Sequence, residues 1–299
     1  MPKFPAYEIY KEYEDPEKYK TSEKRKVEKV LEEASKEQLA KRKEGVENPE
    51  FREVIERESS ALEQFFGEQI EVPPLPAEIT PERYQEWKEK GLELHYLPPV
   101  EMTEDQKYPG WQKKPGKRYT PSQQHGIEFF DEIKKGNLPQ DSAKLPGAWI
   151  LIDERKKPQY KDGKQMYEND SLAPVLEQLR KNGLIDKYGS VPDNSRFGIR
   201  WNELQKPEIK KAIAEALGVE PENLRLPRAI EWNYLGNAFY QKWGDTNTWE
   251  WFEDDYQKGQ GRLDGGRSGR GGLSRVPWGA PDSRRDNLGF RPLVVFSEK

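Results

Sequence analysis

The sequence contains no cysteine, and only two of its 299 residues are histidine. Without cysteine the chain cannot form a disulfide, use a thiol nucleophile, or ligate zinc or an iron–sulfur cluster through sulfur. His95 and His125 stand in different sequence contexts and have no third partner to complete a metal site. We therefore expect no bound metal and no cofactor. The absence of cysteine is typical of a cytosolic or virus-encoded protein.

Long apolar runs are also missing. The N-terminal stretch MPKFPAYEIYKEYEDPEKYK lacks the apolar segment of a signal peptide. No other stretch approaches the ~18 apolar residues that a spanning helix needs. We expect no membrane span, and the location expected from the sequence is cytoplasmic or virion-associated.

The third absence is local and is the most informative. The chain has 31 Lys, yet residues 262–296 contain no Lys, Glu, Gln or Met. The same stretch holds seven of the 19 Arg. An ordinary surface in a chain this rich in Lys and Glu would contain both. The bias indicates a constraint on which side chains occur here, as expected of an exposed recognition surface on a fixed frame.

What the chain does contain points to a folded, very polar protein. Charged residues make up 35% and the apolar class 33%, while nine Trp and 14 Tyr contribute to an aromatic content of 11%. Aromatic side chains bury large areas, so we expect a compact, Trp-rich core and not wholesale disorder. The net charge of −4 gives no general attraction to nucleic acid.

The N-terminal quarter is predicted to be helical. Residues 1–20 have no clear period and are interpreted as an arm, whereas 21–44 place apolar residues at helical spacing. A second helix is predicted from Asn48-Pro49 to a stop at Gly67. The pair is either a helical hairpin packed on the main domain or a module for oligomerisation or attachment. The VPPLP run at 72–76 suggests a boundary, which divides the chain into 1–75 and 76–299.

The remainder has an α+β pattern. Strands are predicted at 92–100, 146–153 and 288–296. Helices are predicted over 207–217, followed by Gly218, and from about Pro227. Loops rich in Pro and Gly separate these elements, and neither a βαβ rhythm nor an internal repeat is present.

Ordered motifs near the C-terminus carry a resemblance. RLPRAIEWNY (225–234) resembles the RLPTEAEWEY motif of formylglycine-generating-enzyme-like domains at the same spacing, and NTWEWFEDD (247–255) resembles their GNVWEW segment. RLDGGRS (262–268) and NLGFRP (287–292) resemble the closing RGGSW and GFR elements. Each motif alone is weak, but the ordered set is strong. The resemblance implies a C-type-lectin-like domain over 76–299, preceded by the helical segment.

Within that fold, RL-x-GG-x-S-x-x-GGL-x-x-V…LGFRPLV looks most like the variable proteins of diversity-generating retroelements. In that family an error-prone reverse transcriptase substitutes template adenines, and AAC codons changed in this way cannot encode Lys, Glu, Gln, Met or Trp. The composition of 262–296 agrees with this, and Trp278 departs from it. The resemblance implies a variable region over about 253–292 and a non-enzymatic protein that binds a protein or another ligand on a cell or virus surface.

The resemblance divides this region into anchors and contact residues. Gly residues and seven apolar anchors are expected to form a fixed frame above Trp232, Trp249 and Trp251. The anchors are Leu263, Leu273, Val276, Leu288, Phe290, Leu293 and Val295. The ligand-binding, outward-pointing positions are expected to be Asp264, Arg267, Ser268, Arg270, Ser274, Arg275, Pro277, Trp278, Ser283, Arg284 and Arg285, joined by Asp254 and Tyr256. The alternative is that these residues are solvated loop positions without a ligand.

Three other functions are weighed against this one. A formylglycine-generating oxidoreductase would need the cysteines that the chain lacks, although Glu231 and Glu250 are possible paired carboxylates. GGRSGRGG (265–272) resembles an Arg-Gly RNA-binding box but is short and lies in an acidic chain, so we do not expect nucleic acid as a partner. The consecutive Glu253, Asp254 and Asp255 are candidate calcium ligands or a solvated loop.

Overall fold

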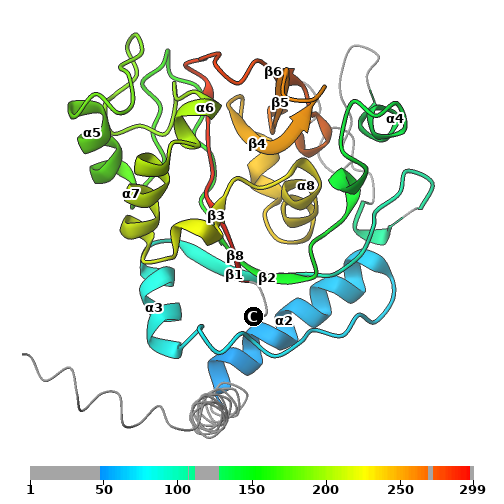
Figure 1. Cartoon of the computed structure of the whole chain (residues 1–299). Helices are drawn as coiled ribbons and strands as arrows, with labels where there is room; N and C mark the ends of the chain where they lie inside the picture. The colour runs from blue at the N-terminus through cyan, green and yellow to red at the C-terminus, as the bar shows by residue number, and fades with distance from the viewer. Residues whose placement is uncertain (1–47, 107, 112–127, 269–271, 297–299) are drawn as a thin grey trace, which may run out of the picture.

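The computed structural model describes residues 48–106, 108–111, 128–268 and 272–296 (Figure 1). In these ranges the protein has an α+β architecture with two four-stranded sheets. The helices are α2 (Pro49–Phe66), α3 (Pro81–Glu89), α4 (Phe129–Lys134), α5 (Ala173–Lys181), α6 (Trp201–Leu204), α7 (Pro207–Leu217) and α8 (Ala229–Ala238). The strands are β1 (Leu92–Leu97), β2 (Ala148–Asp153), β3 (Leu224–Arg225), β4 (Trp249–Tyr256), β5 (Gly261–Gly265), β6 (Trp278–Gly279), β7 (Leu288–Gly289) and β8 (Leu293–Phe296).

The first sheet has the strand order β1-β2-β8-β3 and is antiparallel throughout. Figure 1 shows α2 and α3 on one side of this sheet, with α8 and the second sheet on the other. The first sheet therefore forms the middle of a layered molecule, and the second sheet lies above it in Figure 1. None of the helices in the described ranges has the length and apolar composition of a membrane-spanning segment.

Helix α2 confirms the prediction for its segment. The Asn48 side chain accepts a hydrogen bond from the Glu50 amide, Pro49 occupies the first turn, and Gly67 ends the helix with φ +79°. Its apolar face, including Phe51 and Phe65, belongs to the same hydrophobic core as the strands. Residues 49–66 therefore pack against the main domain, although they precede the predicted boundary at residue 75. The arm and the predicted helix at 21–44 lie outside the described residues.

The strands and helices predicted in the middle of the chain are present with small shifts. Strand β1 ends at Leu97 because Pro98 and Pro99 have no N–H to donate, and β2 starts at Ala148. Helix α7 spans Pro207–Leu217, and Gly218 follows it with φ +74°. Helix α8 begins at Ala229.

The predicted strand at 288–296 is wrong as a single element. Leu288–Gly289 forms β7, which runs parallel to β4 in the second sheet, whereas Leu293–Phe296 forms β8 in the first. Pro292 cannot donate to a ladder, and the Arg291 side chain between the two strands is fully buried. The C-terminal segment therefore passes from one sheet to the other and ties them together.

Candidate functional site

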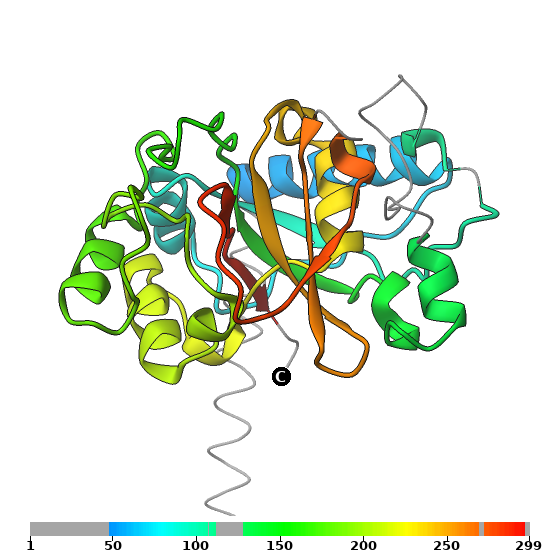
Figure 2. The ribbon, with the colours of Figure 1, turned by 90° about the horizontal axis from the view of Figure 1, so that it is seen from above.

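The strands of the second sheet and the loops between them carry the predicted recognition region. Its order is β6-β5-β4-β7, in which β4, β5 and β6 are antiparallel. Figure 2 shows β4 and β5 side by side next to α8. The motifs of the sequence analysis occupy adjoining positions, since α8 carries the first, β4 the second, and β5 and β7 the closing pair.

The anchors that were expected to form the frame are buried. Trp232, Trp249 and Trp251 are at most 3% exposed, as are six of the seven predicted apolar anchors: Leu263, Leu273, Val276, Leu288, Phe290 and Leu293. Val295 is partly exposed. Gly265 also fits the frame closely, because a Cβ there would lie 2.6 Å from the Phe252 ring. Close packing of this kind holds the backbone of β5 in one position.

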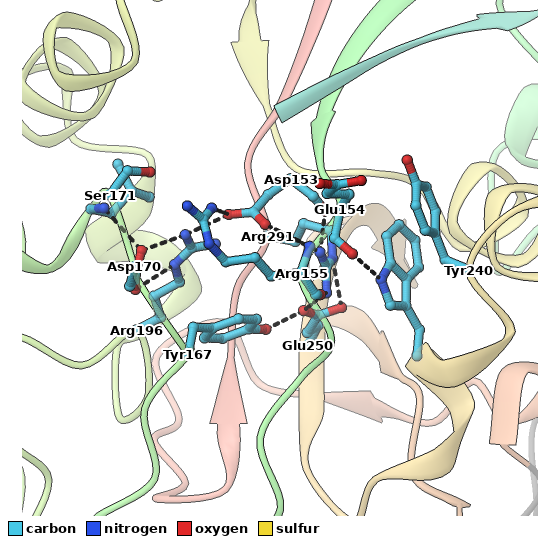
Figure 3. A network of polar contacts seen from close by, with 12 residues as sticks. Asp153, Glu154, Arg155, Tyr167, Asp170, Ser171, Arg196, Tyr240, Glu250 and Arg291 are labelled. Carbon is cyan, nitrogen blue, oxygen red and sulfur yellow. Dashed lines mark hydrogen bonds and ion pairs between the residues drawn. The ribbon is translucent and has the colours of Figure 1, made fainter. Parts of the chain in front are cut away.

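Glu250 lies at the centre of a buried polar network (Figure 3). Its carboxylate accepts hydrogen bonds from Trp232 Nε1 at 2.7 Å and from the Tyr167 hydroxyl, and it pairs with Arg291 Nη2 at 2.9 Å. Burial opposes the charge, but Arg291 and Lys157 hold the pKa of Glu250 below its ordinary value. A carboxylate committed to three donors and closed to solvent supports the frame.

The network continues through Asp153 at the end of β2. Arg196 Nη2 lies 2.6 Å from Asp153 and 2.5 Å from Asp170, and Arg155 pairs with Asp153 at 2.8 Å. Figure 3 shows Arg196 and Arg291 converging on Asp153 from different segments. Charged groups at this depth are stable only when their hydrogen bonds are satisfied, so the network fixes the junction between the two sheets.

Lys157 fixes the loop that leaves β5. Its ammonium group donates to the carbonyl oxygens of Thr248 at 3.2 Å and Gly266 at 2.5 Å, and it lies over the Trp232 ring. The side chain is 1% exposed, and burial lowers its pKa to about 7. Gly266 has φ +97°, and a Cβ there would meet the Lys157 ammonium at 2.5 Å. The start of the loop is thereby held next to Thr248, the residue directly before β4.

Five of the predicted contact residues do not point outward. Asp254, Tyr256, Asp264, Ser274 and Arg275 are all at most 5% exposed. Asp254 accepts a hydrogen bond from the Ala229 amide at the start of α8, and burial raises its pKa to about 7. Asp264 pairs with Arg285, and burial raises its pKa to about 6 despite that partner. These five residues therefore belong to the buried frame and not to the outer surface.

Two arginines of the predicted surface are also held by the frame. Arg275 is 4% exposed and lies 5.0 Å from the centre of the Trp249 ring. The side chain of Arg284 is 8% exposed and pairs with Asp186 at 2.5 Å and Glu203 at 2.9 Å. Neither guanidinium is presented to solvent, so the expectation of an arginine-rich outer face is wrong at these two positions.

The remaining predicted positions keep accessible surface. Trp278 is 43% exposed, and the Arg285 side chain is 37% exposed. Four others are partly exposed: Arg267, Ser268, Pro277 and Ser283. Arg267 lies over the Trp249 ring at 5.9 Å, and in the described part of the chain no carboxylate pairs with it. Arg270 lies outside the described residues.

The three consecutive acidic residues of β4 point to alternating sides of the strand and have different partners. Glu253 accepts a hydrogen bond from the Leu226 amide, Asp254 caps α8, and Asp255 pairs with Arg262 at 2.8 Å. In the part of the chain that the structure describes, no group of three or more acidic or histidine residues is placed to hold a metal ion. The three neighbours in sequence therefore do not form one calcium site.

The other candidate catalytic groups are engaged in structural contacts. Glu231 pairs with Arg225 at 2.7 Å and accepts from the Arg228 amide at the start of α8. His95 is buried between Glu58 and the Tyr240 hydroxyl, at 3.0 and 2.6 Å. His125 lies outside the described residues.

Comparison of the chain with family models, curated proteins and solved structures gave no match. The interpretation of the site therefore depends on its motifs and geometry. Four frame residues were not predicted from the sequence. Lys157 and Arg196 come from loops, and Glu132, which accepts a hydrogen bond from the Tyr256 hydroxyl, comes from the short helix α4, where no motif marks it. Asp153 is the last residue of β2, and its place at the end of an apolar strand was the one available signal.

Proposed function

We propose that the protein is a non-enzymatic binding protein with a C-type-lectin-like domain, whose C-terminal loops form a recognition surface diversified by a retroelement. One observation carries the proposal. The stretch that lacks Lys, Glu, Gln and Met combines closely packed anchors with accessible side chains, within the same 35 or so residues. Such a segment tolerates change at selected positions while the backbone stays fixed.

The positions that suit variation are the accessible ones. Arg267, Ser268, Pro277 and Ser283 have partly exposed side chains, and exposed substitutions usually cost under about 0.5 kcal/mol. Arg285 is also accessible, but it pairs with the buried Asp264 and is therefore less free to change. The five buried residues, with Arg284, belong to the frame. The diversified surface is then smaller than the segment 253–292. Fewer residues of the segment are available to contact a ligand than the sequence alone suggests.

The proposed function is supported by the spatial separation between the buried residues of the frame and the accessible side chains. The network of Glu250, Arg291 and Asp153 lies below the surface and makes no use of the accessible side chains. Arginine and tryptophan are frequent at binding hot spots, because both combine a planar apolar area with polar groups. The ligand proposed here is a protein or another molecule on the surface of a cell or virus.

The DNA next to the gene tests the proposal. We expect a near-copy of the codons for residues 253–292, beside a gene for a reverse transcriptase. The two copies should differ chiefly where the template has adenine. The differences should fall on codons for accessible positions such as Ser268 and Ser283 and spare those for the buried anchors Leu263 and Phe290. A locus with no such copy would contradict retroelement diversification.

A further inference from the structure

Trp278 is the most exposed large apolar side chain of the described residues, at 43%, with Tyr160 next at 36%. Its ring stacks on that of Tyr256, with centroids 5.2 Å apart and planes at 27°. The indole also covers Gly261, where a Cβ would lie 2.7 Å from Trp278 Cε3. One face of the indole is therefore packed against the sheet, and the side chain still keeps a large accessible area.

The stack is held from below. The Tyr256 hydroxyl donates to Glu132 Oε2 at 2.8 Å. Glu132 is 3% exposed and also accepts from Asn137 at 2.8 Å and Lys135 at 3.0 Å. An aromatic group fixed in this way loses little side-chain entropy when a ligand covers it, which favours tight binding.

The backbone of Trp278 lies at an edge of the second sheet. Among the residues that the structure describes, strand β6 is the end strand of its sheet and pairs with β5 alone. The Asp264 amide donates to the Pro277 carbonyl at 2.9 Å, so these two residues form a hydrogen-bonded pair. Antiparallel ladders alternate, and Leu263 opposite Trp278 is then a non-hydrogen-bonded pair. The N–H and C=O of Trp278 consequently point away from β5.

Two accessible positions flank this edge. A Cβ on Gly279 would lie 3.5 Å from both Ser283 Oγ and Arg285 Nη2, so both side chains reach the neighbourhood of β6. Pro277 and Pro281 bracket the strand and, having no N–H, prevent a longer ladder from forming at this edge. The edge thus offers one residue's donor and acceptor beside an apolar plane.

We infer that Trp278 and its edge backbone are the constant anchor of the recognition surface, which takes one residue of an extended segment of a protein ligand. The inference rests on the proposed function. A single donor and acceptor next to an exposed indole match the main chain and side chain of an extended polypeptide. Under the proposed diversification an AAC codon never becomes a Trp codon, so position 278 is not an AAC target, and Trp278 is kept while Ser283 varies.

A display library of the full chain tests the anchor. Positions Arg267, Ser268 and Ser283 are randomised, Trp278 is kept, and binders are selected against purified lysozyme and ubiquitin. We then expect Trp278→Ala to weaken each binder about 30-fold, which corresponds to a hot spot of about 2 kcal/mol. Trp278→Phe should retain most of the affinity. Tyr160→Ala, the matched loss of an exposed aromatic, should leave it unchanged.

Hydrogen exchange on the same binders tests the main-chain contact. The amide of Trp278 should gain protection when the target binds and lose that gain in Trp278→Ala, whose folding is verified by circular dichroism. Binders that keep their affinity in Trp278→Ala contradict the anchor alone. A library without any binder contradicts the proposed function and the anchor together. Self-association abolished by Trp278→Ala would show that the edge pairs with a second copy, which also overturns the inference.

Discussion

Glu250 on β4 and Arg291 between β7 and β8 form a fully buried ion pair at 2.9 Å, and this pair joins the two sheets. Arg291 also lies 4.0 Å from the centre of the Trp243 ring and contributes to the network around Asp153. The C-terminal segment is therefore fixed by charge, by stacking and by the two ladders on either side. Any recognition surface carried by β5 and β6 depends on this junction.

Replacing Arg291 by Met should destabilise the protein strongly. The buried Glu250 loses its main partner, and an uncompensated buried charge typically costs about 3–5 kcal/mol. Urea unfolding followed by circular dichroism measures the change. The double variant Arg291→Met/Glu250→Gln should lose less than the sum of the two single variants, since the charge is removed as well. Lys181→Met, which breaks an exposed pair with Glu177, should leave the midpoint unchanged. Strict additivity would contradict the pairing.

Lys157 should make the free energy of unfolding depend on pH. Its folded pKa is lowered to about 7 by burial, against an ordinary value of 10.5. Between these values the unfolded chain binds the proton that the folded chain has lost, so stability rises with pH from about 7 to about 10.5. Lys157→Met should lack this rise. The measurement is the difference between wild type and Lys157→Met in urea unfolding at pH 7 and pH 9. An equal difference at both pH values would show that Lys157 does not titrate in this range.

Asp254 should also make the free energy of unfolding depend on pH. Its contribution should fall as the pH rises, whereas that of Lys157 rises, and it should do so at lower pH. Burial raises its folded pKa from 3.8 to about 7, so the stability it contributes is complete below about pH 4 and is lost as the pH rises to about 7. Asp254→Asn keeps an acceptor for the Ala229 amide and removes the buried charge. We expect the variant to be more stable than wild type at pH 8, by roughly 1–2 kcal/mol, and to show no such gain at pH 4. Thermal unfolding at the two pH values checks this. A loss of stability at both would contradict the assignment.

The sequence predictions succeeded where a structural feature is determined by residues close together in the sequence. Asn48-Pro49 and Gly67 set the ends of α2, and Pro207 and Gly218 set those of α7, because caps act within a few residues. The anchors were found because apolar spacing and the Trp motifs report burial. The split of 288–296 was missed because it depends on which sheet each half joins, and pairing with β2 or β4 is not encoded nearby.

The contact residues were predicted less well for a similar reason. Polar side chains were assigned to the surface, yet Asp264 and Arg275 are buried by neighbours distant in sequence. Trp278 was included among the contacts, but its stacking on Tyr256 across the sheet has no local signal. Residue type was enough to predict the buried apolar frame. Which polar side chains remain accessible depends instead on the partners that they find in the folded structure.

Arg267 and Arg275 provide a matched test of which positions tolerate variation. Both guanidiniums lie over the ring of Trp249, at 5.9 and 5.0 Å, but Arg275 is 4% exposed and Arg267 is partly exposed. Arg275→Ser removes a buried side chain from the frame and should cost at least about 2 kcal/mol. Arg267→Ser should cost less than about 0.5 kcal/mol, because water replaces an accessible side chain. Urea unfolding of the two variants measures both values. The substitution and the aromatic neighbour are the same in both variants, so only burial differs. Equal costs in unfolding free energy would mean that burial does not separate fixed from variable positions. The assignment of Arg275 to the frame and of Arg267 to the recognition surface would then be wrong.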